Sequence, residues 1–227
     1  YDLIINIWGA DHHGYLPRVN SAMAALGEDI EKFKVVFIQF ANLFRGGRKV
    51  SMSTREGEFI SLKELIKEVS SEAARFFYLN RKGNQHLDFD LDLAKKETKD
   101  KPLYYIQYAH ARICSVFSKL QKEKRQYNES VGKDFVSLLN SEKEIQIIQL
   151  LSQYSEMLNR SANNFEPHLL CYYLQELAAG FHSYYNEQKI LVSNEEELQA
   201  RLFFLSAIKQ VIFNGLKVLG IKAPVSM

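Results

Sequence analysis

The spacing of apolar residues changes along the chain, from strand-like in the first part to helical in the remainder. Apolar runs over residues 3–8 and 35–40 predict two strands, and a polar loop and a helical pattern over residues 19–26 follow the first of them. Gly46 and Gly47 can supply the positive φ angles of a tight hairpin turn. Strand, polar loop and helix in this order are typical of an α/β sheet that offers its carboxyl edge to a ligand.

From Ser61 onward the apolar period is that of helices. Ser61 and Glu64 fit a capping box, in which the serine oxygen accepts from the third helical N–H and the glutamate reaches back. Pro102 suits the first turn of a helix and follows a charged stretch, so we place a domain boundary near residue 100. The predicted helices span residues 62–69, 72–79, 103–124, 143–160, 167–187 and 195–219, and Gly220 caps the last of them.

Composition sets broad limits on the kind of protein. The chain has 227 residues, of which 46% are hydrophobic, and this is enough apolar material for two packed units. Cys114 and Cys171 lie far apart within helical patterns, so we expect reduced core thiols. No run approaches the roughly 18 apolar residues of a membrane helix, and no signal peptide is evident, so we expect a cytoplasmic protein without a membrane partner. Because the first strand opens at the terminus without an initiator Met, we expect the later part of a longer protein, with half an active site.

The net charge does not by itself indicate a kind of partner, since a net charge of +2 attracts phosphate only weakly. Its distribution is more informative. Basic residues gather around residues 45–55 and again around residues 119–133, with few acidic residues among them. Each cluster is either a solvated face or a contact for an anionic partner.

Asp11, His12 and His13 follow the first predicted strand and lie between two glycines. Adjacent histidines rarely converge on one ion, and zinc requires further ligands, so we expect no metal site. The histidines could instead cap the next helix. We favour a ligand loop, in which Gly9 and Gly14 permit close approach, the imidazoles bind phosphate or ribose, and Asp11 pairs with a cation.

Residues 49–57 form a second polar segment, between the predicted hairpin and the capped helix. Small hydroxyl residues beside a basic side chain and a glycine suit a segment that closes over a polyphosphate and donates to a leaving pyrophosphate. The alternative is a solvent-exposed connector.

The predicted helix after Pro102 has two different faces. One is an apolar stripe that suits packing in a bundle, made of Leu103, Ile106, His110, Ile113, Phe117 and Leu120. The other combines aromatic, cationic and hydroxyl groups at Tyr105, Tyr108, Arg112, Ser115 and Lys119. Such a surface can stack an unpaired RNA base and hold its phosphate. Alternatively, the tyrosines pack beneath a neighbouring element.

Several of these segments occur in an order and spacing that match one known family. They are residues 8–18, 52–57, 73–77, 86–92, 105–113 and the closing 219–227. Together they resemble arginyl-tRNA synthetase of the bacterial type, a class I enzyme, over essentially the whole chain.

The resemblance implies a fold and an activity. The fold is an α/β remnant of a Rossmann-type catalytic domain (residues 1–60), connecting helices near the tRNA (61–100) and a mostly α-helical anticodon-binding bundle of the DALR type (101–227). The activity is ATP-dependent attachment of arginine to its tRNA through an arginyl-adenylate, with ATP and Mg²⁺ as the substrate complex. It further implies a cytoplasmic monomer whose isolated fragment is inactive.

Individual residues take roles from the same resemblance. Gly9, His12, His13 and Met52 would contact ATP or the adenylate, and Asp11 would contact arginine. Ser53, Thr54 and Arg55 would be catalytic, in a loop that resembles the signature Lys-Met-Ser-Lys-Ser but has Ser51 and Thr54 in place of its lysines. The other class I signature, His-Ile-Gly-His, does not occur in the sequence. The tRNA would be bound by Tyr105, Tyr108, Arg112 and Lys119.

Two alternatives use the same residues differently. The chain could be a stand-alone module that binds a tRNA anticodon without catalysis. It could also belong to a synthetase for cysteine or methionine, but those relatives commonly carry clustered zinc ligands, which two isolated cysteines cannot provide.

Overall fold

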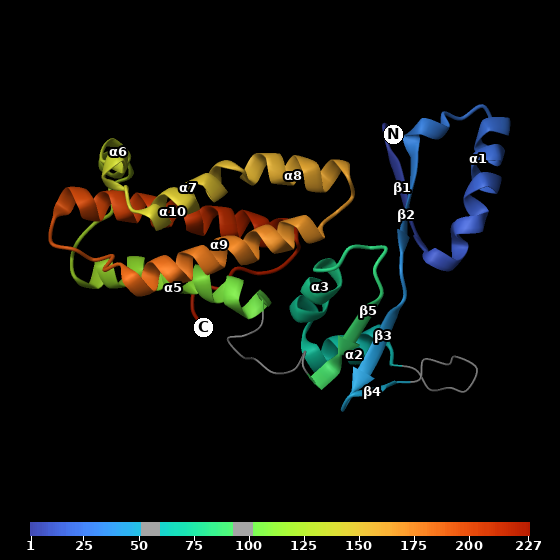
Figure 1. Cartoon of the computed structure of the whole chain (residues 1–227), viewed down its shortest axis with the longest axis horizontal. Helices are drawn as coiled ribbons and strands as arrows, with labels where there is room; N and C mark the ends of the chain where they lie inside the picture. The colour runs from blue at the N-terminus through green and yellow to red at the C-terminus, as the bar shows by residue number, and fades with distance from the viewer. Residues whose placement is uncertain (51–59, 93–101) are drawn as a thin grey trace. The chain divides into compact units, whose positions relative to one another are not determined.

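The computed structural model describes residues 1–50, 60–92 and 102–227. The chain divides into two compact units, Tyr1–Lys96 and Glu97–Met227 (Figure 1). The first combines short strands with helices, and the described part of the second is helical.

The first unit opens with two parallel strands joined through a helix. β1 (Ile4–Gly9) pairs with β2 (Phe33–Ile38), and the connection contains the 3₁₀ turn η1 (Ala10–Tyr15), helix α1 (Leu16–Ala25) and the short 3₁₀ turn η2 (Ile30–Lys32). The predicted order of strand, polar loop and helix is therefore confirmed. Because parallel strands end at the same edge, the loop after β1 lies at the carboxyl edge of the sheet.

A second sheet has the order β4-β3-β5. β3 (Ala41–Arg45) and β4 (Arg48–Lys49) form the predicted hairpin, in which Gly46 and Gly47 take φ of 59° and 72°. Both angles lie in the left-handed region that a tight hairpin turn requires. β5 (Leu87–Asp90) pairs in parallel with β3 and was not among the predicted strands.

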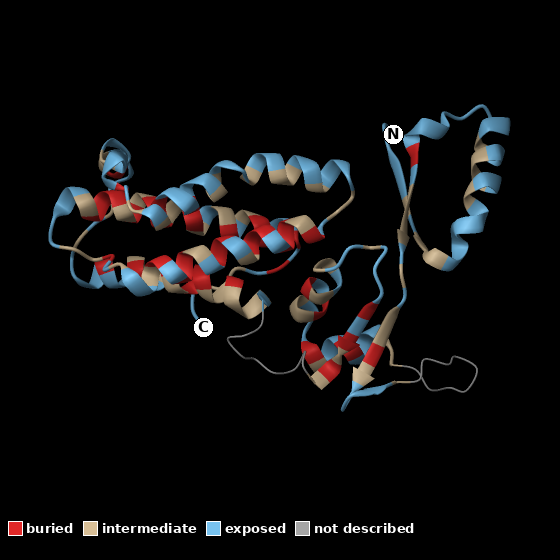
Figure 2. Cartoon of the chain, viewed as in Figure 1, coloured by how far each residue is buried: buried red, intermediate tan, exposed pale blue. Residues whose placement is uncertain are grey.

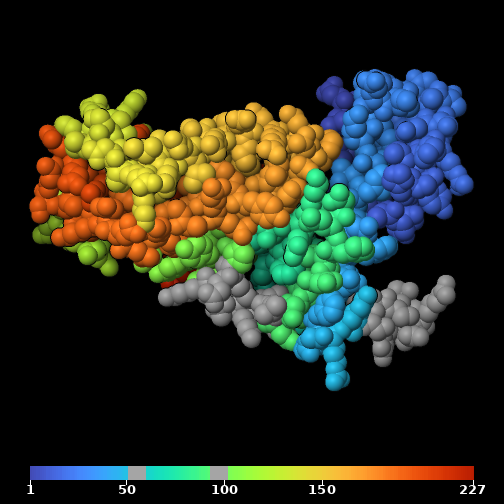
Figure 3. All heavy atoms as spheres, viewed as in Figure 1, coloured from blue at the N-terminus to red at the C-terminus, as the bar shows by residue number. Residues whose placement is uncertain are grey.

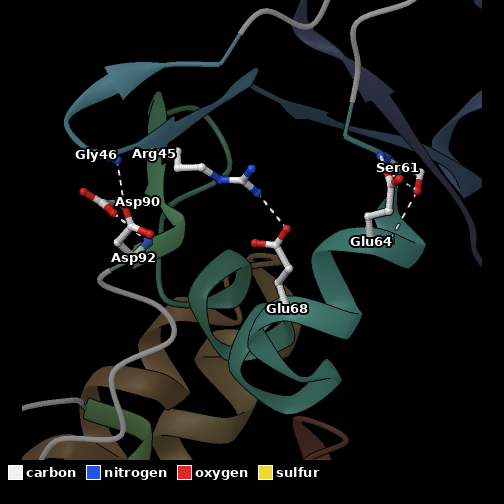
Figure 4. A network of polar contacts seen from close by, with 7 residues as sticks. All are labelled: Arg45, Gly46, Ser61, Glu64, Glu68, Asp90 and Asp92. Carbon is white, nitrogen blue, oxygen red and sulfur yellow. Dashed lines mark hydrogen bonds and ion pairs between the residues drawn. The ribbon is translucent and has the colours of Figure 1, made fainter.

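The predicted capping box is confirmed at the start of α2 (Leu62–Val69), which α3 (Ser71–Leu79) follows. The backbone N–H of Ser61 donates to Glu64 Oε2 at 2.8 Å, and the N–H of Glu64 donates to Ser61 Oγ at 3.2 Å (Figure 4). Each side chain therefore satisfies a backbone donor that the helix itself leaves free.

The core of the first unit lies where α2, α3 and the second sheet meet (Figure 2). Two polar contacts lie at the edge of this core. Arg45 Nη2 lies 2.7 Å from Glu68 Oε1, and the N–H of Gly46 donates to Asp92 Oδ2 at 2.6 Å (Figure 4). Elements from residues 41–50 and 60–92 thus share one core. Its buried members are Leu43, Leu65, Val69, Ala74, Leu87, Phe89 and Leu91.

The second unit is a helical bundle. On the face that Figure 3 shows, α7 and α8 follow one another end to end, and both lie alongside α9. The elements are α5 (Pro102–Lys122), α6 (Glu129–Asp134), η3 (Val136–Leu138), α7 (Glu142–Ser152), α8 (Tyr154–Asn163), α9 (His168–Glu187) and α10 (Glu195–Val218).

One predicted helix of this unit is wrong. The sequence pattern indicates a single helix over residues 143–160, whereas the chain breaks at Gln153 into α7 and α8. A break leaves backbone carbonyls without helical partners. The hydroxyl of Tyr173 on α9 donates to the carbonyl of Leu150 at 2.9 Å, so a contact from another helix stabilises the end of α7. The short α6 was not predicted either.

Helix α10 lies in the core of the bundle. Leu202, Leu205 and Ile208 are fully buried along it. Gly220 follows with φ of 69°, and the N–H of Ile221 donates to the carbonyl of Leu216 at 2.9 Å, which confirms the predicted cap. Across residues 1–50, 60–92 and 102–227, no helix combines the length and the apolar character needed to cross a membrane.

Candidate functional site

Tyr105, Tyr108 and Arg112 follow one another at helical spacing along α5 and meet side chains of α9. The guanidinium carbon of Arg112 lies 4.1 Å from the ring centroid of Tyr185 and 5.3 Å from that of Tyr108. These are cation–π distances. All four side chains are half-buried, so each is held by neighbours and still reaches solvent.

His182 completes this group from within the bundle. Its Nε2 lies 3.1 Å from the carbonyl oxygen of Tyr105, and its Nδ1 lies 3.3 Å from Arg112 Nη1. The ring of Tyr108 stacks on the imidazole with centroids 5.4 Å apart and an interplanar angle of 18°. We call Tyr105, Tyr108, Arg112, His182 and Tyr185 the α5–α9 cluster.

The two polar contacts of His182 fix its protonation state. A carbonyl can only accept, so Nε2 carries the hydrogen, and a guanidinium can only donate, so Nδ1 is the acceptor. Burial lowers the pKa of His182, and the positive charge of Arg112 lowers it further, against the opposing effect of the bond to Tyr105. The imidazole is therefore neutral at pH 7.

A hollow of about 580 Å³ adjoins the cluster and shares Tyr185 with it. Ser115 and Lys119 line it from α5, and Gln188 and Lys189 line it from the segment directly after α9. Lys119 is exposed, and its Nζ lies 4.0 Å from Glu123 Oε1. The predicted polar stripe thus continues from the aromatic residues to an exposed cation, as a surface for a base and its phosphate requires.

Both sequence interpretations of the tyrosines find support in this geometry. Tyr105 and Tyr108 pack on His182, yet each keeps part of its surface exposed. Base stacking at these rings stays a prediction.

The opposite face of α5 packs as predicted. Ile106, His110 and Ile113 are buried. His110 Nδ1 lies 2.8 Å from the carbonyl oxygen of Pro224, to which it donates, and Gln107 donates to the carbonyl of Lys222 at 2.9 Å. These contacts hold the segment after α10 along α5.

The histidine loop, residues 9–14 at the end of β1, is the second candidate site. Asp11, His12 and His13 are exposed, and Asp11 Oδ2 lies 3.7 Å from His12 Nε2. The ring of His13 lies 4.8 Å from that of Phe37 on β2. A Cβ atom at Gly9 would stand 2.5 Å from Asp11 Oδ1, so this glycine leaves space for the carboxylate.

The capping interpretation of the histidines is wrong. Tyr15 occupies the N-cap position of α1, and neither α1 nor η1 has a side-chain cap. Among the residues that the structure describes, no group of three or more His, Cys, Asp or Glu side chains is arranged to hold a metal ion. The imidazoles and the carboxylate are exposed, and ligand binding at this loop stays a prediction.

Residues 51–57 of the second polar segment fall outside the described ranges, and with them Met52, Ser53, Thr54 and Arg55. The basic residues nearby and in the bundle are partly engaged. Arg45 pairs with Glu68, and Arg125 donates to Glu195 Oε2 and to the carbonyl of Val192, both at 2.9 Å. Arg125 therefore stabilises the loop before α10 through these two contacts and is not a free cation for phosphate.

Sequence reasoning missed the contributions of His182 and Tyr185. His182 continues the buried stripe of α9 four residues after Ala178, and the half-buried Tyr185 follows three residues later. A histidine within an apolar stripe needs polar partners in the folded state. That requirement was the available signal, although it does not identify the partner.

Known proteins match this chain over its full length. It is 49% identical over 227 residues to arginine–tRNA ligases of Coxiella burnetii and Legionella pneumophila, and it spans 38–39% of their lengths. A solved structure from Campylobacter jejuni, described as a proposed arginyl-tRNA synthetase, has a TM-score of 0.84 and 33% identity, over 100% of this chain and 48% of that one. Arginyl-tRNA synthetase of Thermus thermophilus has the same fold, with a TM-score of 0.77 and 22% identity, over 100% and 41% of the two chains.

A family description covers the helical bundle. Residues 106–227 match the "DALR anticodon binding domain", and this region contains most of α5 together with α9 and α10. The α5–α9 cluster lies almost entirely within the matched residues, with Tyr105 directly before them. This chain belongs to the DALR anticodon-binding domain family.

Proposed function

We propose that this chain supplies the tRNA-binding part of an arginine–tRNA ligase, an enzyme that joins arginine to its tRNA at the expense of ATP through an arginyl-adenylate. The support is the likeness to arginine–tRNA ligases over all 227 residues and the match to an anticodon-binding domain. The chain spans 38% of the length of such a relative, so the ligase reaction itself is part of what we propose.

The observation that carries the proposal is the α5–α9 cluster. Its half-buried tyrosine rings offer faces on which unpaired bases stack, and Arg112 offers N–H donors to a phosphate or a base edge. Lys119 extends the surface with an exposed charge. Together they form a site for a single-stranded RNA loop.

The histidine loop takes the substrates of activation in this proposal. His12 and His13 face the adenosine and phosphates of ATP, Gly9 allows the nucleotide close to the backbone, and Asp11 pairs with the amino group of arginine. ATP enters with Mg²⁺. Met52, Ser53, Thr54 and Arg55 act at the departing pyrophosphate, as their resemblance to the class I signature implies.

Binding of an arginine-accepting tRNA to the 227-residue chain tests the proposal. Arg112→Met should weaken binding about tenfold and reduce its dependence on salt, because one phosphate contact is lost. The matched control is Arg160→Met, which removes an exposed arginine of α8. Equal losses in the two variants would contradict the assigned site.

In the alternative function, the chain is a stand-alone module that binds RNA through the same surface and has no catalytic role at the histidine loop. The helical unit, which forms a compact unit of its own, favours it. Arginine-dependent exchange of pyrophosphate into ATP separates the two functions in the cellular polypeptide that carries this chain. His12→Asn and His13→Asn should slow exchange, whereas unchanged rates would favour the module. The chain alone should not catalyse exchange.

A further inference from the structure

The proposed function does not use the buried imidazole of His182. We propose that His182 is a positioning residue, whose neutral side chain holds the guanidinium of Arg112 in place to receive RNA. This inference rests on the proposed function of the α5–α9 cluster. It assigns a role to a side chain that lies beneath the binding surface.

The imidazole of His182 is anchored by a backbone hydrogen bond and by two aromatic rings. His182 is 3% exposed, and its Nε2–H donates to the backbone carbonyl of Tyr105 at 3.1 Å. The rings of Tyr105 and Tyr108 lie 4.2 and 5.4 Å from it, centroid to centroid. The backbone bond and the two rings therefore fix the direction in which Nδ1 points.

The guanidinium of Arg112 is held by His182 and Tyr185. Its Nη1 donates to Nδ1 at 3.3 Å, and Tyr185 supports the guanidinium from α9 at 4.1 Å. A long arginine side chain has many rotamers in water, and fixing one of them before binding reduces the entropy lost when RNA binds. His182 and Tyr185 therefore preorganise the cation.

The contact with His182 leaves the positive charge of Arg112 unneutralised. Among residues 1–50, 60–92 and 102–227, no carboxylate lies within ion-pair distance of Arg112. A carboxylate in the place of His182 would hold the guanidinium more strongly but would neutralise it. A neutral acceptor positions the arginine and leaves its full charge for a phosphate. The other four N–H groups of the guanidinium are not used by this contact.

Protonation would reverse the effect of His182. The titratable or charged groups that face it are Arg112, Tyr105 and Tyr108 from α5, with Tyr185 on its own helix near the guanidinium. An imidazolium has no acceptor at Nδ1 and repels the cation beside it. Burial and Arg112 both favour the neutral form through the lowered pKa.

Amide substitutions separate the two polar contacts of His182. Asn places its oxygen close to the position of Nδ1, whereas Gln places its amide close to Nε2. His182→Asn should keep the acceptor and bind an arginine-accepting tRNA within about threefold of the unchanged chain, while His182→Gln should bind about tenfold more weakly. In an Arg112→Met background, His182→Gln should cause no further loss of affinity.

A matched control guards against a purely structural effect. His168 is also a buried histidine of α9 and lies outside the cluster. His168→Gln should lower the thermal midpoint about as much as His182→Gln without changing tRNA affinity. A tenfold loss on adding His182→Gln to Arg112→Met would overturn the positioning role, as would full affinity in the single variant His182→Gln.

A second measurement does not depend on RNA. Nitrogen NMR of the imidazoles in the unchanged chain should show the neutral Nε2–H tautomer of His182 at pH 7, and an imidazolium or an Nδ1–H tautomer would contradict the inference. Should the unchanged chain fail to bind tRNA, the proposed function fails, whereas the tautomer still tests the contact with Arg112.

Discussion

In the helical unit the side chains predicted to bind RNA are held between α5 and α9. The side chains of the histidine loop, which are predicted to bind ATP and arginine, lie instead on the exposed edge of a small sheet. Arg112 has partners from both helices, while Asp11 contacts His12 and the ring of His12 contacts that of nearby Tyr15. The elements behind the two regions differ in the same way: Ile7 of strand β1 is 71% exposed, and Ile113 of helix α5 is fully buried. A preorganised site retains its geometry without its ligand, and a loop on an open sheet depends more on what binds to it.

The largest expected effect is a loss of stability in the packed helical unit. Leu205 of α10 is fully buried, so Leu205→Ala should lower the free energy of unfolding of the helical unit by about 2–5 kcal/mol. Ile7→Ala should change stability by less than about 0.5 kcal/mol, since its side chain is largely exposed. Urea denaturation with hydrogen exchange measures both changes. Similar losses at the two positions would contradict the contrast in packing.

Acid should weaken the helical unit next. Burial lowers the pKa of both His110 and His182 from the ordinary value of 6.5, so the unfolded chain binds more protons between that value and the folded pKa. Stability is thus fully present above pH 6.5 and is lost as the pH falls through the folded values. Denaturation at pH 7.5 and pH 5.5 should show this loss. His182→Asn should reduce it, and an unchanged slope in that variant would contradict the assignment.

The two capping boxes offer a smaller and more closely matched comparison. Ser141 and Glu144 begin α7, as Ser61 and Glu64 begin α2. Glu144 is buried and also accepts from the hydroxyl of Tyr184 at 3.0 Å. Ser141→Ala should therefore cost about 1–2 kcal/mol and Ser61→Ala about 0.5–1 kcal/mol of unfolding free energy. A larger loss at Ser61 would show that burial does not strengthen the cap.

The smallest effect is expected at the histidine loop. Gly9→Ala would bring a methyl group to 2.5 Å from Asp11 Oδ1. Because the exposed carboxylate can turn away, the free energy of unfolding should change by less than about 0.5 kcal/mol. The thermal midpoint should therefore change little. A loss as large as that of Leu205→Ala would show that the loop is packed as tightly as the bundle.

Local signals in the sequence predicted much of this fold. The hairpin at Gly46 and Gly47 and the capping box of Ser61 and Glu64 depend on residues close together in the chain, so their chemistry is readable without a fold. β5 was missed although buried Leu87 and Phe89 alternate with Asp88 and Asp90, because the run is only four residues long.

The remaining features depend on contacts between distant residues. The break at Gln153 is supported by Tyr173, which lies on another helix. Likewise, the stripe on α5 identified Tyr105, Tyr108 and Arg112, but their arrangement depends on His182, 70 residues beyond Arg112. Sequence periodicity identifies a face of a helix and does not say which side chain will meet it.

The most direct test of the RNA-binding surface compares a single-stranded loop with a duplex. Tyr108→Ala should weaken binding of the 227-residue chain to the anticodon stem–loop of an arginine-accepting tRNA about tenfold, because a stacking partner of an unpaired base is lost. Binding to the same stem closed as a continuous duplex should change far less, and Tyr172→Ala, at an exposed tyrosine of α9, should leave both affinities unchanged. Equal losses for loop and duplex in Tyr108→Ala would contradict base stacking at the α5–α9 cluster.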